Sequence, residues 1–143
     1  MRVDYFDMTR RAQRLYTQLM EPLCAAHSIS RSELDVLLFL HNNPEYDRAA
    51  DIVAHRGMVK SQVSASVANL EERGLLVRSA DAEDRRTVHL SLTELAIEIA
   101  QAGRNLQRKF FEDLFAGISH EELLAWERLI QTIDGNMLCM EAK

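Results

Sequence analysis

Residues 60–93 read KSQVSASVANLEERGLLVRSADAEDRRTVHLSLT, and the changes of pattern along this stretch decide the fold. Its first part carries apolar residues at steps of three and four, which predicts a helix that ends at Gly74. These apolar residues are Val63, Val67 and Leu70. The short apolar run at 75–77 and the alternating residues 87–92 predict two strands. The charged residues 80–86 between the strands predict a long hairpin tip, that is, a wing.

A shorter helix is predicted directly before this one, at about residues 48–56, and Gly57 separates the two. Two short helices joined by a turn that contains Gly are the signature of a helix-turn-helix. Further upstream, Ser30 and Glu33 have the spacing of a capping box, so we expect a helix to begin there. The run at 42–44, Asn-Asn-Pro, ends it.

Three longer helical patterns flank this module, at about residues 5–27, 93–116 and 120–137. Pro22 predicts a kink or break in the first, and Thr93 is a candidate N-cap for the second. All three are more apolar than the central module can bury. We therefore expect a second copy of the chain to cover their remaining apolar faces.

The patterns together predict a mainly α fold with a small β-hairpin wing: a winged helix-turn-helix domain flanked by dimerisation helices. A chain of 143 residues favours one domain. Within it, we expect residues 31–93 to form the winged helix-turn-helix. Residues 1–30 and 94–143 would supply the dimerisation helices.

The composition excludes several classes of protein. Hydrophobic residues make up 47% and charged residues 27%, and five Gly and two Pro argue against disorder or a turn-rich all-β fold. No apolar run approaches the roughly 20 residues of a bilayer span, and the first residues lack the apolar segment of a secretory signal. We therefore expect a cytoplasmic protein with no membrane partner. The net charge of −5 excludes a broad basic coat but leaves room for a local basic site.

In this order and at these spacings, four blocks of sequence resemble the MarR family of winged helix-turn-helix transcriptional regulators. The blocks are residues 60–64, 70–78, 84–86 and 90–93. The resemblance runs from about residue 20 to the last helix. It implies a homodimer that binds a pseudo-palindromic operator in double-stranded DNA, usually as a repressor. It also implies that a small aromatic or anionic effector relieves the binding.

The sequence departs from the family pattern at four positions, which are Val59, Ala65, Asn69 and Ala96. Ala65 and Asn69 stand where Arg is common, which puts some DNA contacts in doubt. These two residues and the acidic body support an alternative reading. In that reading the chain is a winged-helix protein–protein interaction module with weak or no DNA binding.

The polar and small residues of the second short helix would face the major groove, where Gln pairs with adenine and Ala contacts the thymine methyl. Lys60 and the first-turn N–H groups would hold phosphates. An Arg at the wing tip suits the negative potential of a narrow minor groove. In the family an Asp-x-Arg pair carries this role, so Asp84 would orient Arg86 while Arg85 takes a phosphate. The predicted DNA-binding residues are Lys60, Ser61, Gln62, Ser64, Ala65, Asn69, Arg78, Asp84, Arg85 and Arg86. A solvated helix face and a solubilising turn are the plainer interpretations of the same residues.

The resemblance places an effector pocket between the dimerisation helices and the DNA-binding lobe. Our candidates for its lining are Tyr16, Met20, Leu23, His27 and His41, each of which fits plain core packing at least as well.

Cysteine and histidine usage gives no sign of a cofactor or metal. Cys24 and Cys139 are expected to be free thiols, because they lie far apart in a chain expected in a reducing compartment. Cys24 is favoured as a structural thiol, and thiol-based redox sensing through it stays open. The 93–116 helix contains no His, and Leu124 removes the second ligand of a zincin motif begun at His120. With no catalytic constellation, we expect neither an enzyme nor a bound cofactor or metal.

Overall fold

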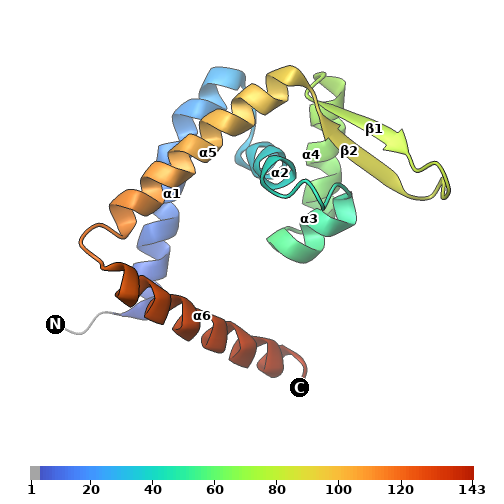
Figure 1. Cartoon of the computed structure of the whole chain (residues 1–143). Coiled ribbons are helices and arrows are strands. Elements are labelled where there is room, and N and C mark those ends of the chain that lie inside the picture. The colour runs from blue at the N-terminus through green and yellow to red at the C-terminus, as the bar shows by residue number, and fades with distance from the viewer. Residues whose placement is uncertain (1–3) are drawn as a thin grey trace. The chain divides into compact units, whose positions relative to one another are not determined.

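The structure is a computed structural model that describes residues 4–143, so the first three residues of the expected N-terminal dimerisation segment lie outside it. The chain divides into two compact units, Met1–Phe110 and Phe111–Lys143, and each is described by itself. The elements are α1 (Tyr5–His27), α2 (Arg31–Asn42), α3 (Ala49–Arg56), α4 (Lys60–Glu72), β1 (Leu76–Ala80), β2 (Val88–Leu92), α5 (Glu94–Leu114) and α6 (His120–Glu141). The predicted mainly α fold with a β-hairpin wing is confirmed (Figure 1).

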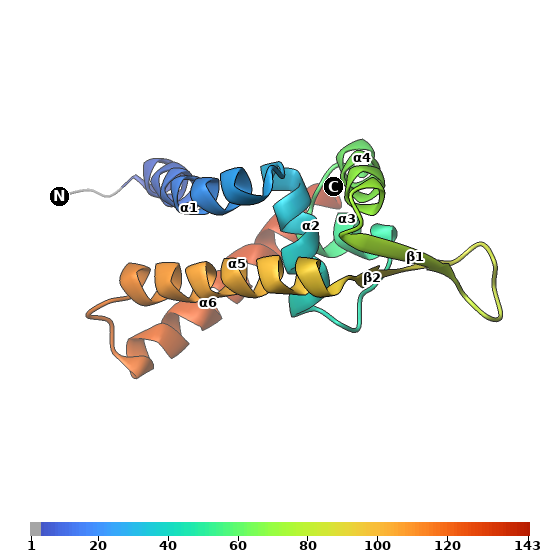
Figure 2. The ribbon, with the colours of Figure 1, turned by 90° about the horizontal axis from the view of Figure 1, so that it is seen from above.

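The first unit is built around α2, which lies between α1 and α5 on one side and the helix-turn-helix of α3 and α4 on the other (Figures 1 and 2). Most of α2 is buried, because its sequence is apolar on nearly every side. Its neighbours complete the core with Met20, Ile52, Val63, Val67, Leu70, Leu76, Leu90 and Ile99. Gly103 of α5 allows a close approach here, since a Cβ at this position would lie 2.8 Å from Cδ2 of Leu38.

The helix α1 is not broken at Pro22, so the predicted break is wrong. The chain stays helical to His27, and Ser28 ends the helix in a left-handed conformation with φ 52°. Leu23 and Cys24, in the turn after the proline, pack against the core. This burial holds the helix together although Pro22 donates no backbone hydrogen bond.

Two predicted helix caps turn out differently. The Ser30 hydroxyl accepts the Glu33 N–H at 3.1 Å, as predicted, but the Glu33 carboxylate lies 3.9 Å from Arg73, so the capping box is one-sided. Thr93 precedes α5, yet its buried hydroxyl has no hydrogen-bond partner within residues 4–143. Thr93 therefore occupies the N-cap position, where its carbonyl oxygen accepts the Ile97 N–H at 2.9 Å, but its hydroxyl does not cap the helix. The Thr93 backbone N–H is bonded to the Leu75 carbonyl, which holds this residue beside β1.

The wing is an antiparallel hairpin whose register runs from Leu76 opposite Leu92 to Ala80 opposite Val88. Figure 2 shows it extending away from the helices. Leu90 is buried, but Val88 is 39% exposed. The buried face of β2 therefore stops short of Val88, because the hairpin projects beyond the core at that position.

The second unit consists mainly of α6. It begins with a reciprocal capping box between Ser119 and Glu122, whose two hydrogen bonds measure 3.2 and 2.8 Å. The Ser119 N–H and hydroxyl lower the pKa of Glu122. Phe115 packs edge-on against Trp126 with ring centroids 5.0 Å apart. None of the residues of α6 is buried.

A separate finding concerns membranes: within the part of the chain that the structure describes, no helix combines the length and apolar character of a bilayer span.

Candidate nucleic-acid interface

The exposed side of α4 carries the residues predicted to read DNA. Those residues are Lys60, Ser61, Gln62, Ser64, Ala65 and Asn69, and all six are exposed. The opposite side of the helix is buried through Val63, Ser66, Val67 and Leu70. The helix therefore has one buried apolar face, as predicted from the spacing, and one exposed face of small and polar residues.

The N-terminus of α4 is open. Val59 occupies the N-cap position and no side chain caps the helix within the described residues. The first turn holds no acidic residue, and Lys60 lies in it. The free N–H groups and the ammonium group together make this end suited to a phosphate.

Gln62 is exposed but not free. Its amide nitrogen donates to the hydroxyl of Ser32 in α2 at 2.6 Å. The amide nitrogen carries two hydrogens, so one is held by Ser32 and the other can still donate to an adenine edge. The contact also fixes where the amide stands, because it ties the side chain to a second helix.

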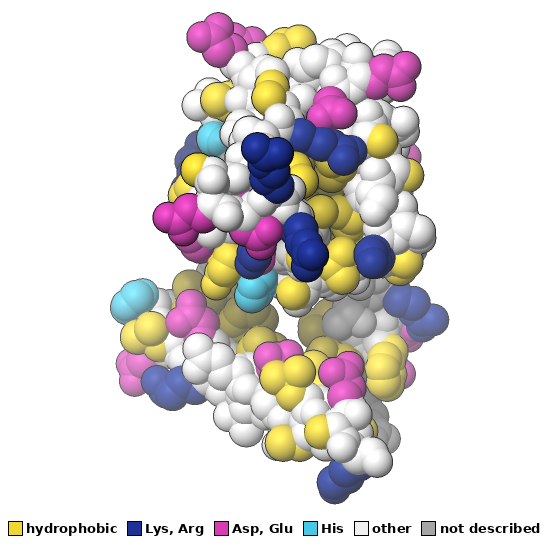
Figure 3. All heavy atoms as spheres, turned by 90° about the vertical axis from the view of Figure 1, so that its right-hand side faces the viewer, with side chains coloured by type: hydrophobic (Ala, Val, Ile, Leu, Met, Phe, Trp, Pro, Cys, Tyr) yellow, Lys and Arg dark blue, Asp and Glu magenta, His cyan; other side chains and the backbone are white. Residues whose placement is uncertain are grey.

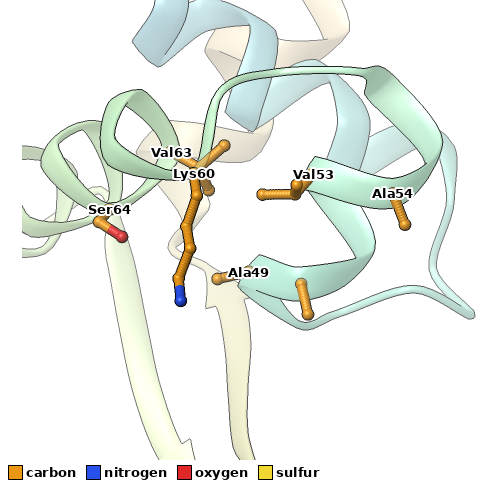
Figure 4. A pocket seen from close by; sticks show the side chains of 7 residues that line it. Ala49, Val53, Ala54, Lys60, Val63 and Ser64 are labelled. Atoms are coloured by element: carbon orange, nitrogen blue, oxygen red, sulfur yellow. The ribbon is translucent and has the colours of Figure 1, made fainter.

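Small side chains leave a hollow between α3 and α4 at the same surface (Figure 4). It has a volume of about 300 Å³ and is lined by Ala49, Ala50, Val53, Ala54, Lys60, Val63 and Ser64. In Figure 4 the Lys60 side chain extends along the opening between the two helices. The sequence did not predict this hollow. The feature that could have indicated it is the group of three small residues in α3, Ala49, Ala50 and Ala54.

The wing tip is shaped by two aspartates. Asp81 accepts the N–H groups of Glu83 and Asp84 at 3.2 and 3.0 Å. Asp84 accepts the backbone N–H of Arg86 at 3.0 Å and the Thr87 hydroxyl at 3.3 Å. The expected brace thus acts on the backbone of Arg86 and not on its guanidinium. It fixes the position from which the side chain leaves the turn.

The three arginines of the wing differ in their surroundings. Arg85 and Arg86 are exposed at the tip. Arg78, on β1, is exposed too, but its guanidinium lies 3.1 Å from the carboxylate of Glu71. A phosphate contact by Arg78 would have to replace or share this ion pair.

His89 holds the base of the wing. The sequence pattern identifies it only as one of the alternating residues of a strand. His89 Nδ1 lies 2.9 Å from Asp47 in the α2–α3 loop, and Nε2 lies 2.9 Å from Asp81. The hydrogen bonds that the His89 ring donates to Asp47, and then to Asp81, raise the pKa of His89. The bond to His89, followed by the N–H groups of Asp84 and Glu83, lowers the pKa of Asp81. No local sequence signal predicts this cluster, because Asp47 lies 42 residues from His89.

A second missed residue is Arg73, at the C-terminal end of α4. Its guanidinium donates to the carbonyl oxygens of Ser28 and His27, which end α1. In the sequence it is one residue of the block at 70–78 that resembles the family. In the structure, these hydrogen bonds also link the end of α4 to the end of α1.

The candidate effector residues differ in their surroundings. Met20 is fully buried, Leu23 lies close to Gly103, and His27 and His41 are partly buried. Tyr16 is the member of that set that lines a cavity of about 420 Å³. The lining of this cavity is Gln13, Tyr16, Thr17, Arg31, Asp35 and Arg56. Arg31 stacks over the Tyr16 ring at 4.5 Å from its centroid.

The thiols differ in exposure. Cys24 is partly buried, and desolvation raises its pKa, while Cys139 is exposed. A raised pKa keeps a thiol protonated and poorly reactive. No group of three His, Cys, Asp or Glu within residues 4–143 is placed to hold a metal ion.

The side of the molecule that carries the wing has charges of both signs. Figure 3 views the molecule from this side, and several Lys and Arg side chains lie near the middle of the face. Asp and Glu side chains lie between and around them. The wing side therefore offers local basic groups on a chain with a net charge of −5.

Comparison with known proteins agrees with this geometry. The model of the MarR family matches residues 27–87. The structure of S. aureus MepR in its DNA-binding conformation is 20% identical, covers 94% of this chain and 99% of that chain, and gives a TM-score of 0.83. The S. aureus MepR–DNA complex has the same identity and coverage, with a TM-score of 0.78.

A third relative is Bordetella bronchiseptica BpsR, in a structure that concerns regulation of its DNA binding by 6-hydroxynicotinic acid. It is 19% identical, covers 92% of this chain and 93% of that chain, and gives a TM-score of 0.69. At these identities the structures establish a shared fold, and the family match adds the sequence evidence. The MepR–DNA complex shows a protein of this fold bound to DNA. Residues 27–87 of this chain thus match the MarR family, and the chain has the winged-helix fold of the MepR and BpsR structures.

Proposed function

We propose that this chain is a homodimeric, sequence-specific DNA-binding regulator that acts in the cytoplasm. In our account it represses transcription, and a small aromatic or anionic effector relieves its binding to DNA. The observation that carries the proposal is the exposed polar face of α4 beside a wing with two exposed arginines at its tip.

In the proposed complex, α4 enters the major groove. Gln62, Ser61 and Ala65 would contact base edges, because their side chains suit the patterns of adenine and thymine. Lys60 and the open N-terminus of α4 would hold a phosphate and fix the register. Ser64 and Asn69 complete the face.

The wing would reach the adjacent minor groove. Asp84 fixes the backbone of Arg86, so this arginine leaves the turn from a defined position. Arg85 has no such bond to Asp84 among the described contacts and would pair with any phosphate within reach. Arg78 would contact a phosphate of the DNA backbone once its ion pair with Glu71 is broken.

A second copy of the chain is proposed to cover the apolar side chains of α1, α5 and α6, the flanking helices of the expected single domain. Phe6 is 73% exposed and Leu129 62%, and α6 as a whole has no buried residue. Other large exposed apolar residues in these helices are Met8, Leu15, Phe111, Leu114, Trp126, Ile133 and Leu138. A symmetric dimer would bury them and place two copies of α4 about one helical turn of DNA apart.

The cavity at Arg31 offers a place for the proposed effector. Two guanidinium groups, Arg31 and Arg56, lie 3.1 and 3.6 Å from the carboxylate of Asp35. The Tyr16 ring forms a neighbouring wall. An aromatic anion could stack on the ring and exchange with Asp35 for the arginines. A hundredfold loss of DNA affinity requires a coupling of only about 2.7 kcal/mol.

Three features favour a second candidate function. Gln62 is hydrogen-bonded to Ser32, Arg78 is paired with Glu71, and the net charge is −5. A winged-helix module that contacts proteins in place of DNA would have these features. Redox sensing through Cys24 receives less support, because burial raises the pKa of its thiol.

A salt series separates the two functions. The full-length protein is titrated into mixed-sequence duplex DNA at several salt concentrations, and binding is followed by fluorescence anisotropy. A DNA-binding regulator gives affinity at low salt that falls linearly on logarithmic axes, with a slope of about −0.9 per phosphate contacted. Absence of binding at the lowest salt concentration would rule out the regulator and leave the interaction module.

A further inference from the structure

The base of the wing is fastened to the rest of the first unit through one side chain. His89 lies on β2, with Asp47 on one ring nitrogen and Asp81 on the other. Asp47 belongs to the α2–α3 loop, and Asp81 begins the wing tip. The neighbouring Leu90 N–H donates to the Asp47 carbonyl at 2.7 Å, so loop and strand are joined twice.

The chemistry of imidazole decides what this arrangement requires. A neutral ring has one N–H donor and one lone pair, whereas a protonated ring donates from both nitrogens. Ionised carboxylates only accept. Both 2.9 Å contacts are therefore hydrogen bonds only when His89 is an imidazolium. In a neutral ring, the lone pair of the unprotonated nitrogen would face a lone pair of the neighbouring carboxylate oxygen.

We propose that His89 is a positioning residue for DNA binding: as an imidazolium it clamps the wing to the α2–α3 loop, and its deprotonation releases the wing. The proposal rests on the proposed function for its effect on DNA. The clamp itself is a property of the free protein.

The surroundings of His89 leave no other cation to take its place. Within residues 4–143, the ion pairs of Asp47 and Asp81 are both with His89. Arg48, next to Asp47, is engaged with Asp51 at 3.2 Å, and the strand partner of His89 is the uncharged Ser79. The two carboxylates occupy opposite ring nitrogens, so they do not converge on a single metal ion.

The sign of the pH effect follows from these contacts. Asp47 and then Asp81 raise the pKa of His89 above its ordinary value of about 6.5. The clamp is therefore complete below that ordinary value and is lost as the pH rises through the raised pKa. Wing order, and with it DNA affinity, should fall over this window.

The first test uses the free full-length protein. NMR of the His89 ring nitrogens, with amide hydrogen exchange of residues 80–88, is recorded across the pH range. We expect both nitrogens to stay protonated above the ordinary histidine pKa of about 6.5, and wing exchange, corrected for its intrinsic pH dependence, to rise as the ring deprotonates. In Asp47→Asn the transition should move to lower pH. A ring that deprotonates at or below about 6.5, or a wing whose corrected exchange ignores the transition, would overturn the clamp.

The second test measures affinity for one selected duplex across the same pH range. As the pH rises, the wild type should lose about tenfold in affinity for each unit by which the pKa of His89 is higher in the complex than in the free protein. In His89→Gln this component should be absent, while His120→Gln, which changes a histidine at the start of α6, should keep it. A His89→Gln profile equal to wild type would overturn the role in DNA binding. If no variant binds DNA, the proposed function fails, and the NMR experiment still decides the clamp.

Discussion

The guanidinium of Arg73 donates a 2.7 Å hydrogen bond to the carbonyl oxygen of Ser28. A second bond, 2.6 Å long, reaches the carbonyl of His27. Carbonyls at the end of a helix lack intrahelical donors, and here a side chain from α4 supplies them. The link matters for function, because α1 carries part of the proposed dimer face and α4 carries the proposed DNA contacts. The spacing of two recognition helices in a dimer would depend on it.

Replacing Arg73 by Met should lower the free energy of unfolding by about 1.5–3 kcal/mol, since hydrogen bonds from a charged donor are lost at two carbonyls. Urea unfolding measures the change. Arg78→Met is the matched control, because its partner Glu71 is equally exposed and such surface pairs contribute at most about 1 kcal/mol. Equal losses in both variants would show that the Arg73 bonds do not fasten α4 to α1.

Gln62→Ala should cost about 1–3 kcal/mol in affinity for a selected operator and relax the preference at one base position. Ser32→Ala removes the acceptor that holds the Gln62 amide in place. Affinity should then fall less, because the amide is still present but is no longer held. Competition titrations against single-base variants of the operator measure both effects. A Gln62→Ala variant with unchanged base preference would exclude this residue from the reading face.

Arg86→Ala should weaken DNA binding by about 1–3 kcal/mol and reduce the salt slope by about one unit. Arg85→Ala should cause a smaller loss that is uniform across sequences. Asp84→Ala should act as a weaker Arg86→Ala, since it removes the bonds to the Arg86 N–H and the Thr87 hydroxyl but leaves the charge. Titration of the three variants at several salt concentrations gives the comparison. Equal losses for the two arginines would mean that the wing does not insert as proposed.

Mild peroxide should leave DNA binding nearly unchanged, because desolvation raises the pKa of the Cys24 thiol and keeps it protonated. Binding is measured before and after treatment of the wild type and of Cys24→Ser, with Cys139→Ser as the exposed control. Loss of binding in the wild type that the Cys24 change prevents would favour a redox sensor.

The sequence predicted those features that arise from local periodicity. Apolar spacing located α4 and its buried face, and Gly74 marked the turn that follows it, where the backbone adopts φ 70°. The break at Pro22 was wrong because packing of the next turn, which local sequence does not record, keeps α1 helical. Thr93 stands at the predicted N-cap position, but its buried hydroxyl makes no hydrogen bond within residues 4–143.

Long-range contacts in the candidate site escaped prediction for the same reason. The Gln62–Ser32 bond spans 30 residues and the His89–Asp47 bond spans 42. Neither pair has a spacing that periodicity can detect, because each joins different elements. Residue types alone indicated that Gln62 could contact a base. They did not indicate that a second helix would hold its amide.

Selection of bound sequences from random duplex DNA, followed by sedimentation of the selected complex, tests the central claim most directly. The account predicts a pseudo-palindrome whose half-sites lie about one helical turn, 10–10.5 base pairs, apart, bound by two copies of the chain. A double variant, Gln62→Ala with Arg86→Ala, should fail to enrich the same sequence while remaining folded. Absence of any enriched sequence at low salt, or enrichment of a single half-site bound by one copy, would contradict the account.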